Sequence, residues 1–219
     1  MSLSYPSSTM TPLPTQVEKA VDVIRRSGVV AIPTDTVYGL AASPFDQVAV
    51  QRIYEIKHRP TNLAMPLLLA NLSDLPDYAS KVPDSAWDLA SKFWPGALTL
   101  VLPKADRIPA SVSGGKQTIA LRVPNAWLPR AVATELQSPI TGTSANISGS
   151  PPATTASEVA RVFGSSITII KYDEPSQNRQ VSTVLDLSNE IPCILRQGAI
   201  SKAQIETICG PVSIPHNGT

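Results

Sequence analysis

Four short polar segments hold the residue types that bind small anions, and each interrupts or follows an apolar run. They are Pro33–Leu40 (PTDTVYGL), Lys57–Pro60 (KHRP), Thr118–Arg122 (TIALR) and Thr141–Gly149 (TGTSANISG). Hydroxyls, amides and backbone N–H groups can surround phosphate oxygens, while arginine and lysine can clamp phosphates or carboxylates. These residues therefore suit a small, polar ligand.

Each segment also has a structural interpretation, which the residues alone leave open. Asp35 could accept hydrogen bonds from nearby backbone amides in a turn. The cations at 57–59 follow a predicted helix and could interact with its dipole. Thr118 and Arg122 share one face of a predicted strand, which could face solvent. The segment 141–149 could be an ordinary loop rich in Ser and Thr.

A serine hydrolase is one alternative function. Ser144 is the candidate nucleophile, and it would need Lys57 or His58 as its base. The other histidine, His216, lies in a polar C-terminal segment. The sequence lacks the nucleophile-elbow pattern that hydrolases of this kind often carry.

The composition favours one domain with a real core and argues against several classes of protein. The chain has 219 residues, of which 42% are apolar and 16% charged, and its formal net charge is +1. Nucleic-acid-binding domains usually carry a clear basic excess, which this balance lacks. Two histidines exclude a metal site built on several histidines, and Cys193 and Cys209 lack zinc-site spacing. We expect two idle thiols in a reducing compartment.

The two ends of the chain are expected to lie outside the folded domain. Residues 1–14 are rich in Ser, Thr and Pro, with no Lys or Arg, which is typical of a disordered tail and not of a secretory signal. No stretch has the ~18 consecutive apolar residues of a membrane helix. We therefore expect a cytoplasmic protein with a domain at 15–210 and a C-terminal tail at 211–219.

Apolar periodicity predicts helices and strands that position the polar segments. The predicted helices are 16–27, 46–57, 72–78, 83–93, 127–136, 157–163 and 201–208, and the predicted strands are 29–32, 37–40, 66–70, 97–102, 118–123, 140–143, 167–170, 183–187 and 191–195. Thr15 is the predicted N-cap of the first helix, which Gly28 ends, and Thr155 or Ser157 and Ser201 are the predicted caps of the last two.

These elements interleave without strict βαβ repetition. We therefore expect a single α/β domain with a twisted mixed sheet. The Rossmann glycine pattern and the Walker phosphate loop are both absent, so any nucleotide must be held by another device.

In combination, the polar segments resemble the YrdC-like family of threonylcarbamoyl-AMP synthases. The matching pieces, in the family's order, are Pro33–Leu40, Lys57-x-Arg59-Pro60, Trp94–Gly96 with Leu98–Thr99, Ala120-x-Arg122-Val123-Pro124, Thr143–Gly149, Ser182–Thr183 and Leu195-Arg196-x-Gly198. One such motif would be weak, whereas seven in order are specific. The chain resembles the short form of the family, without the extra C-terminal domain of longer members.

The resemblance implies a YrdC-like fold with a large concave cavity. It implies a nucleotidyltransferase that condenses L-threonine, bicarbonate and ATP to threonylcarbamoyl-AMP and pyrophosphate. Mg²⁺ would be bound mainly through the ATP phosphates, with no metal-ligating residue in the protein. The product would pass to a tRNA threonylcarbamoyl transferase complex that forms threonylcarbamoyladenosine, and weak RNA binding would be compatible with this role.

The family's motifs also imply roles for individual residues. ATP and its phosphates would be held by Lys57, Arg59, Thr118, Ser144, Asn146 and Arg196, and threonine by Thr36, Arg122 and Ser182, with Lys57 and Arg59 as the catalytic residues. No covalent enzyme intermediate is implied, because the amine of threonine attacks bicarbonate and the carbamate oxygen attacks the α-phosphorus. The protein would act by positioning reactants and neutralising charge.

Two places depart from the family pattern. Residues 61–70 lack the histidine that ends this loop in many members, and Arg179 stands where a glycine often precedes Ser182. We expect a flap at 173–181 to close differently, with Arg179 adding a phosphate contact.

A binding module of related fold is the remaining alternative. Its cations Lys57, Arg59, Arg122 and Arg196 would hold RNA without making product. Such binding would depend steeply on salt concentration, and the nearly neutral composition argues against it.

Overall fold

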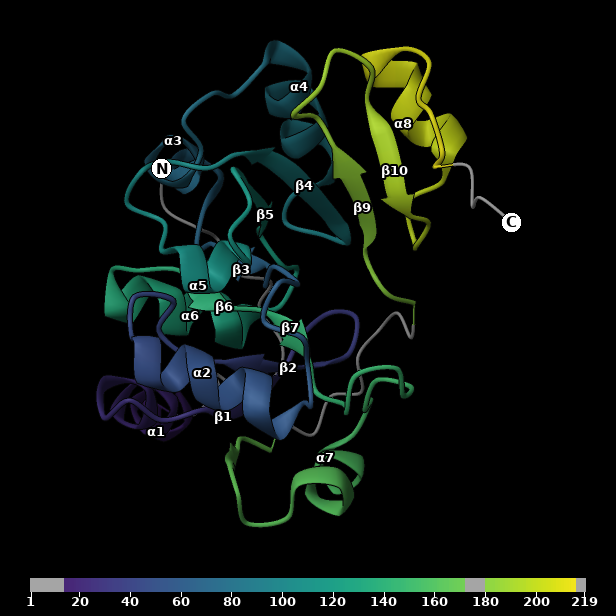
Figure 1. Cartoon of the computed structure of the whole chain (residues 1–219). Coiled ribbons are helices and arrows are strands. Elements are labelled where there is room, and N and C mark those ends of the chain that lie inside the picture. The colour runs from purple at the N-terminus through teal and green to yellow at the C-terminus, as the bar shows by residue number, and fades with distance from the viewer. Residues whose placement is uncertain (1–13, 172–179, 216–219) are drawn as a thin grey trace.

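The computed structural model describes residues 14–171 and 180–215, which form a layered α/β domain (Figure 1). The predictions about residues 1–13, about Arg179 and most of the expected flap, and about His216 lie outside the described residues.

The folded part extends beyond the predicted 15–210 at both ends. The first helix begins at Pro14. Near the other end, Val212 is buried, and the Ser213 N–H donates to the Pro192 carbonyl oxygen at 2.9 Å. Residues 212 and 213 therefore pack on the domain instead of belonging to a tail.

The mixed α/β class is confirmed, but the strands divide between two sheets. Sheet A has four strands in the order β7-β2-β1-β8, and sheet B has six in the order β10-β9-β4-β5-β3-β6. Sheet A comprises β1 (Val30–Pro33), β2 (Tyr38–Ala41), β7 (Thr143–Ser144) and β8 (Thr168–Ile169). Sheet B comprises β3 (Leu67–Leu68), β4 (Leu98–Pro103), β5 (Thr118–Arg122), β6 (Ile140–Thr141), β9 (Thr183–Asp186) and β10 (Cys193–Arg196).

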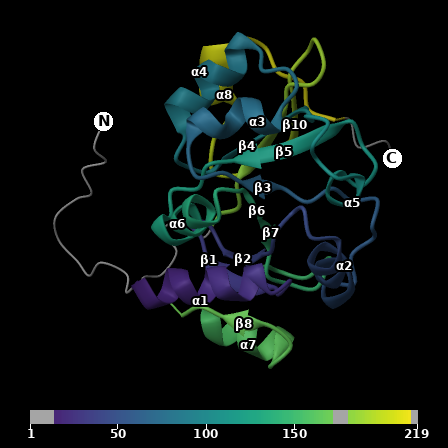
Figure 2. The same ribbon diagram turned by 90° about the vertical axis from the view of Figure 1, so that its left-hand side faces the viewer.

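Helices cover the outer faces of the two sheets. They are α1 (Pro14–Arg25), α2 (Gln47–Ile56), α3 (Leu75–Tyr78), α4 (Asp84–Phe93), α5 (Ala110–Ser113), α6 (Trp127–Leu136), α7 (Ala156–Phe163) and α8 (Lys202–Cys209), with a 3₁₀ turn at Leu72–Asp74. Helices α1 and α6 pack together beside β1, and α4 packs on α8 beside β4. Figure 2 shows α4 and α8 at the top of the molecule and α1 and α6 in its lower half, with β3, β4 and β5 of sheet B between the two pairs and α7 below α1.

Side-chain caps fix the starts of the last two helices as the sequence predicts. The hydroxyls of Thr155 and Ser201 each accept a backbone N–H three residues on, at 3.2 and 3.3 Å, and each belongs to a capping box. The cap predicted for the first helix is not formed. The helix begins at Pro14, which suits a first helical position because proline lacks an N–H, so Thr15 lies inside the helix and does not cap it. The left-handed residue after this helix is Ser27 (φ 59°), not the glycine that follows.

A short segment crosses from sheet B into sheet A. Strand β6 ends at Thr141 and β7 begins at Thr143, so Gly142 alone separates the two sheets. The Thr141 N–H donates to the Ala42 carbonyl oxygen at 3.0 Å, and the Ala42 N–H donates to the Thr141 hydroxyl at 2.9 Å. A Cβ on Gly142 would overlap the Leu68 side chain. The single strand predicted here is therefore split at the glycine.

The apolar core lies in two clusters that hold the sheets in place. The larger one includes Leu40 of sheet A, Leu100 of sheet B and Ile53 of α2. The smaller one joins α1, α6 and β1 through Val21, Val132 and Ile32. Within the described ranges, no helix has the length and apolar character needed to cross a membrane.

Candidate active site

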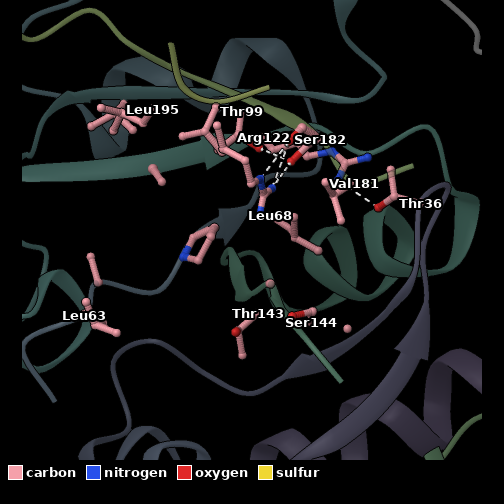
Figure 3. Close-up of a pocket in the computed structure, with 18 of the residues that line it drawn as sticks. Thr36, Leu63, Leu68, Thr99, Arg122, Thr143, Ser144, Val181, Ser182 and Leu195 are labelled. Carbon is pink, nitrogen blue, oxygen red and sulfur yellow. Dashed lines mark hydrogen bonds between the residues drawn. The ribbon is translucent and has the colours of Figure 1, made fainter. Parts of the chain in front are cut away.

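A cavity of about 580 Å³ lies between the two sheets. It is lined by Thr34, Thr36, Val37, Tyr38, Gly39, Thr143 and Ser144 from the side of sheet A, by Leu68, Thr99, Val101, Thr118, Ala120, Arg122, Val184, Asp186, Leu195 and Arg196 from sheet B, and by Arg59, Leu63, Ala64, Pro66, Lys116, Gly142, Val181 and Ser182 from the segments between strands. Figure 3 shows Thr143 and Ser144 on one side of the cavity and Thr99, Arg122 and Ser182 on the other. All four polar segments of the sequence thus contribute to one cavity.

Arg122 is held at one end of this cavity by three partners. Its Nη2 lies 2.6 Å from Asp35 Oδ1, and the two side chains are only 7% and 9% exposed. Its Nη1 donates to the Thr36 hydroxyl at 3.2 Å, and its Nε donates to the Gly96 carbonyl oxygen at 2.8 Å. Burial lowers the pKa of Arg122, and the charge of Asp35 opposes that effect. Asp35 therefore pairs with an arginine instead of stabilising its own turn.

Thr34 makes the turn contacts that the sequence assigns to Asp35. Its hydroxyl accepts the N–H groups of Thr36 and Val37 at 3.2 and 3.3 Å and donates to the Val37 carbonyl oxygen at 2.7 Å. Because that donation uses its only proton, the Thr36 hydroxyl donates to Thr34 across 3.1 Å. The turn thereby fixes the Thr36 hydroxyl as an acceptor for Arg122.

Ser182 forms a second polar cluster beside Arg122. Its hydroxyl lies 2.9 Å from the Thr99 hydroxyl, and Arg196 Nη2 donates to it at 3.0 Å. Arg196 also donates to the Ser182 carbonyl oxygen, from Nη2 at 2.9 Å and from Nε at 3.1 Å. Burial is the main cause that lowers the pKa of Arg196, and the positive charge of Arg122 lowers it further. Two cations therefore lie close enough to favour an anion between them.

Arg59 fastens the loop that departs from the family pattern. Its Nη2 donates to the Ala64 carbonyl oxygen at 2.7 Å and its Nε to that of Leu63 at 3.3 Å. The Tyr54 hydroxyl lies 3.0 Å from the carbonyl oxygens of both Leu63 and Ser111, and it can donate its one proton to either. Burial lowers the pKa of Arg59. Residues 61–70 carry no histidine, and Leu63, Ala64, Pro66 and Leu68 of this segment line the cavity.

Lys57 and Asn146 lie behind the cavity wall and are not among its lining residues. Lys57 is 1% exposed. Its Nζ donates to the Ser144 carbonyl oxygen at 2.5 Å, to the Asn146 carbonyl oxygen at 2.8 Å and to Asn146 Oδ1 at 3.1 Å. Burial, and secondly the charge of Arg59, lower the pKa of Lys57 to about 7.

The contacts of Ser144 do not support a serine–lysine hydrolase. Its hydroxyl bonds to Asn146 Oδ1 at 2.6 Å, while Lys57 contacts the Ser144 backbone and not the hydroxyl. His58 is exposed. The described residues therefore give Ser144 no adjacent base.

Sequence reasoning assigned no individual role to six polar residues of the lining, namely Thr34, Tyr38, Thr99, Lys116, Thr143 and Asp186. Alternation along the strands could have identified two of them. Thr99 is the cross-strand neighbour of Val184 in β9, and Asp186 lies two pleats beyond that residue on the same face. No comparable signal in the sequence identifies Lys116.

The cavity contains few groups that could hold a metal ion. Among its lining residues, Asp186 is the one carboxylate. Within the part of the chain that the structure describes, no three His, Cys, Asp or Glu side chains gather into a metal site.

Comparison with protein families gives one clear match. The family model of Sua5, YciO and YrdC, which carries the description "Telomere recombination", matches residues 22–198.

Curated relatives are similar over most of the chain. It is 40% identical over 200 residues to the threonylcarbamoyl-AMP synthase of Bacillus subtilis, which covers 91% of this chain and 58% of that protein. It is 35% identical over 184 residues to the threonylcarbamoyl-AMP synthase of Vibrio vulnificus, which covers 83% of this chain and 98% of that protein. The chain thus spans 58% of the first relative and nearly all of the second.

Solved structures agree with the sequence comparison. Pyrococcus abyssi Sua5 complexed with L-threonine has a TM-score of 0.87 and 38% identity, over 91% of this chain and 58% of that one. Escherichia coli YciO has a TM-score of 0.79 and 27% identity, over 86% of this chain and 92% of that one.

Proposed function

The chain belongs to the Sua5–YciO–YrdC family, and from this membership we propose that it is a threonylcarbamoyl-AMP synthase. In this proposal L-threonine, bicarbonate and ATP give threonylcarbamoyl-AMP and pyrophosphate, which makes the chain a nucleotidyltransferase. The Pyrococcus abyssi relative was solved with L-threonine, which supports threonine as the amino-acid substrate.

The threonine site is proposed around Arg122. A guanidinium has five N–H donors, and three of those on Arg122 have partners among the described residues. Two N–H groups therefore remain for a carboxylate, which a guanidinium can bind as a fork. Thr36 and Ser182 lie on either side as hydroxyl groups for the amino acid.

The ATP site is proposed across the rest of the cavity. Arg59 and Arg196 supply positive charge for the phosphates, and the hydroxyls of Thr118 and Ser144 supply hydrogen-bonding groups. The apolar side chains between these groups, from Val101, Val184 and Leu195, offer a surface on which a nucleobase can lie. Lys57 and Asn146 remain part of this proposed site through their contacts with Ser144.

The reaction needs little covalent chemistry from the protein. The amine of threonine attacks bicarbonate, and loss of water gives a carbamate. A carbamate oxygen then attacks the α-phosphorus of ATP, and pyrophosphate leaves. The cations Arg59, Arg122 and Arg196 around the cavity would hold the two substrates together and offset the developing charge.

We propose that Mg²⁺ arrives on the phosphates of ATP. The lining supplies a single carboxylate, Asp186, whereas a protein cage for Mg²⁺ needs several oxygen ligands. The residues present therefore do not fit a dedicated metal site.

Transfer of the product to a tRNA threonylcarbamoyl transferase complex is proposed from family membership alone. Weak RNA binding, expected from the same resemblance, stays a prediction that a salt titration with tRNA would test.

The observation that carries the proposal is the single cavity in which anion-binding groups from both sheets face one another (Figure 3). Purified protein with ATP, Mg²⁺, L-threonine and bicarbonate should release pyrophosphate and form threonylcarbamoyl-AMP, detected by mass spectrometry. Omission of threonine or of bicarbonate should abolish both signals. Pyrophosphate release that needs neither substrate would contradict the proposal.

A charge-conserving variant tests the threonine site. Arg122→Lys keeps the charge but loses the fork, so the KM for threonine should rise about tenfold or more, with a smaller change in the KM for ATP. Arg161→Lys, on the exposed face of α7, is the matched control.

A further inference from the structure

The buried Lys57 does not line the cavity, yet it contacts Ser144, which does. It is the C-cap of α2 and is 1% exposed. Its side chain donates to oxygens of Ser144 and Asn146, and its carbonyl oxygen accepts the Ser148 N–H at 2.8 Å. Lys57 thus fixes the segment 144–148 with both its backbone and its side chain.

The orientation of the Asn146 amide is settled by its neighbours. Its Nδ2 donates to the Ser150 carbonyl oxygen at 2.5 Å, and its Oδ1 faces the Lys57 ammonium at 3.1 Å. The Ser150 carbonyl oxygen can only accept, so the atom that faces it is Nδ2 and the atom that faces Lys57 is the acceptor Oδ1.

The Ser144 hydroxyl must therefore be the donor in its bond to Asn146 Oδ1. That bond is 2.6 Å long. The only hydroxyl proton of Ser144 points behind the cavity wall, and only lone pairs remain to face the cavity that Ser144 lines. Lone pairs repel a phosphate oxygen, so the Ser144 hydroxyl in this orientation cannot bind a phosphate.

Ser144 can bind a phosphate only after its hydroxyl turns away from Asn146. The amide oxygen of Asn146, a residue only 9% exposed, then keeps one donor, which is Lys57. Without Lys57 it would be buried with no partner, which is unfavourable by a factor of about 5 to 150 in an equilibrium.

We propose that Lys57 is a positioning residue for ATP binding, which keeps the Asn146 amide oxygen hydrogen-bonded while the Ser144 hydroxyl turns toward a phosphate. The inference rests on the proposed function, since it requires a phosphate ligand in the cavity. It differs from the family-based expectation that Lys57 itself touches ATP.

A double-mutant cycle separates the two roles. Lys57→Met should raise the KM and the Kd for ATP about tenfold, with kcat changed much less. In a Ser144→Ala background no hydroxyl turns on binding, and Asn146 has the same donors in the free and bound states. The effect of Lys57→Met on the ATP constants should therefore fall to about twofold or less.

The opposite outcome would overturn the inference. If Lys57 contacts a phosphate directly, the full loss of ATP affinity persists in the Ser144→Ala background. Lys92→Met, an exposed lysine on α4, is the control and should leave the constants unchanged. If Lys57→Met does not fold, Lys57→Gln is used instead. It keeps an N–H donor for Asn146, so the inference expects ATP constants within about twofold of the wild type, whereas a loss of about tenfold would indicate direct contact between Lys57 and a phosphate.

Failure of the proposed function looks different. Wild-type protein would then form no threonylcarbamoyl-AMP, whereas failure of the present inference leaves wild-type turnover intact and changes only the coupling between the two substitutions.

Discussion

The two buried cations of the site, Arg122 and Lys57, are stabilised in different ways. Arg122 has the carboxylate of Asp35 as a partner, so its charge is balanced within the wall. The described partners of Lys57 are uncharged oxygens of Ser144 and Asn146. Burial therefore acts on the protonation of Lys57 with less opposition, and its pKa falls to about 7.

The lowered pKa of Lys57 predicts a specific dependence of stability on pH. Below pH 7 the residue is protonated in both the folded and the unfolded state. Between pH 7 and about 10.5 the unfolded chain keeps a proton that the folded protein releases, so the free energy of unfolding rises with pH. Relative to Lys57→Met, the wild type should gain about 1 to 2 kcal/mol between pH 7 and pH 9.

Urea unfolding at pH 7 and pH 9 measures this gain. Lys92→Met, which removes an exposed lysine, should follow the wild type. An identical pH dependence in the wild type and Lys57→Met would show that the lysine stays charged throughout.

The Arg122–Asp35 pair predicts an unusually large loss of stability for a conservative change. Asp35→Asn leaves a buried guanidinium without its charge partner, so the free energy of unfolding should fall by about 3 kcal/mol or more. The exposed pair Arg25–Glu135, with side chains 57% and 60% exposed, is the matched comparison. Glu135→Gln should cost less than about 1 kcal/mol. Equal losses in the two variants, measured by denaturant unfolding, would refute the assignment.

Among the structural elements, the crossing from β6 to β7 determines how the two sheets meet. Gly142 is the only residue between them, and its N–H donates to the Pro66 carbonyl oxygen at 2.8 Å. The absence of a Cβ lets the Leu68 side chain pack against the glycine. The cavity wall at this point therefore depends on one close backbone-to-side-chain contact.

The close contact at this crossing predicts that substitutions of Gly142 and Leu68 have coupled effects on the free energy of unfolding. Gly142→Ala should lower the free energy of unfolding by about 1 to 3 kcal/mol, because the new methyl overlaps the buried Leu68. In a Leu68→Ala background the same change should have a much smaller effect. Gly39→Ala, whose Cβ would meet only ordinary contacts at 3.6 Å, is the control. Additive losses in thermal unfolding would contradict this packing.

The sequence predicts the elements better than it predicts their division into sheets. Helix boundaries depend on local capping, and Thr155 and Ser201 cap the helices that their sequences indicate. Strand pairing depends on distant partners: β1 pairs with β8, more than a hundred residues later. No local sequence pattern indicates that Gly142 separates two sheets. The side chain that leaves no room for a Cβ at this position comes from Leu68, which is distant in the sequence.

The site shows the same limit. The residue types in the polar segments indicated side chains that gather around the cavity, because these segments carry groups that can bind a small anion. They did not indicate that Lys57 lies behind the wall or that Asp35 pairs with Arg122, since both facts depend on burial and on side-chain direction.

For the whole molecule, the position of the cavity between two sheets predicts that its ligands cooperate. Threonine and ATP would each contact groups from both sides, so the first ligand would order part of the surface that the second one needs. In buffer freed of bicarbonate, the rise in Tm with both ligands should exceed the sum of the separate rises by about 2 °C or more. D-threonine is the control amino acid. Strictly additive shifts would mean that the two sites are independent.

The order of the strands along the chain has a final consequence. Sheet A takes β1 and β2 from the start of the chain and β7 and β8 from its later part, and sheet B takes all its strands from the stretches between and after them. A backbone cut anywhere between Ala41 and Thr143 would therefore leave each fragment with an incomplete sheet A. Neither half could build the cavity wall alone, and fragments of this protein should regain the cavity only by reassociating with each other.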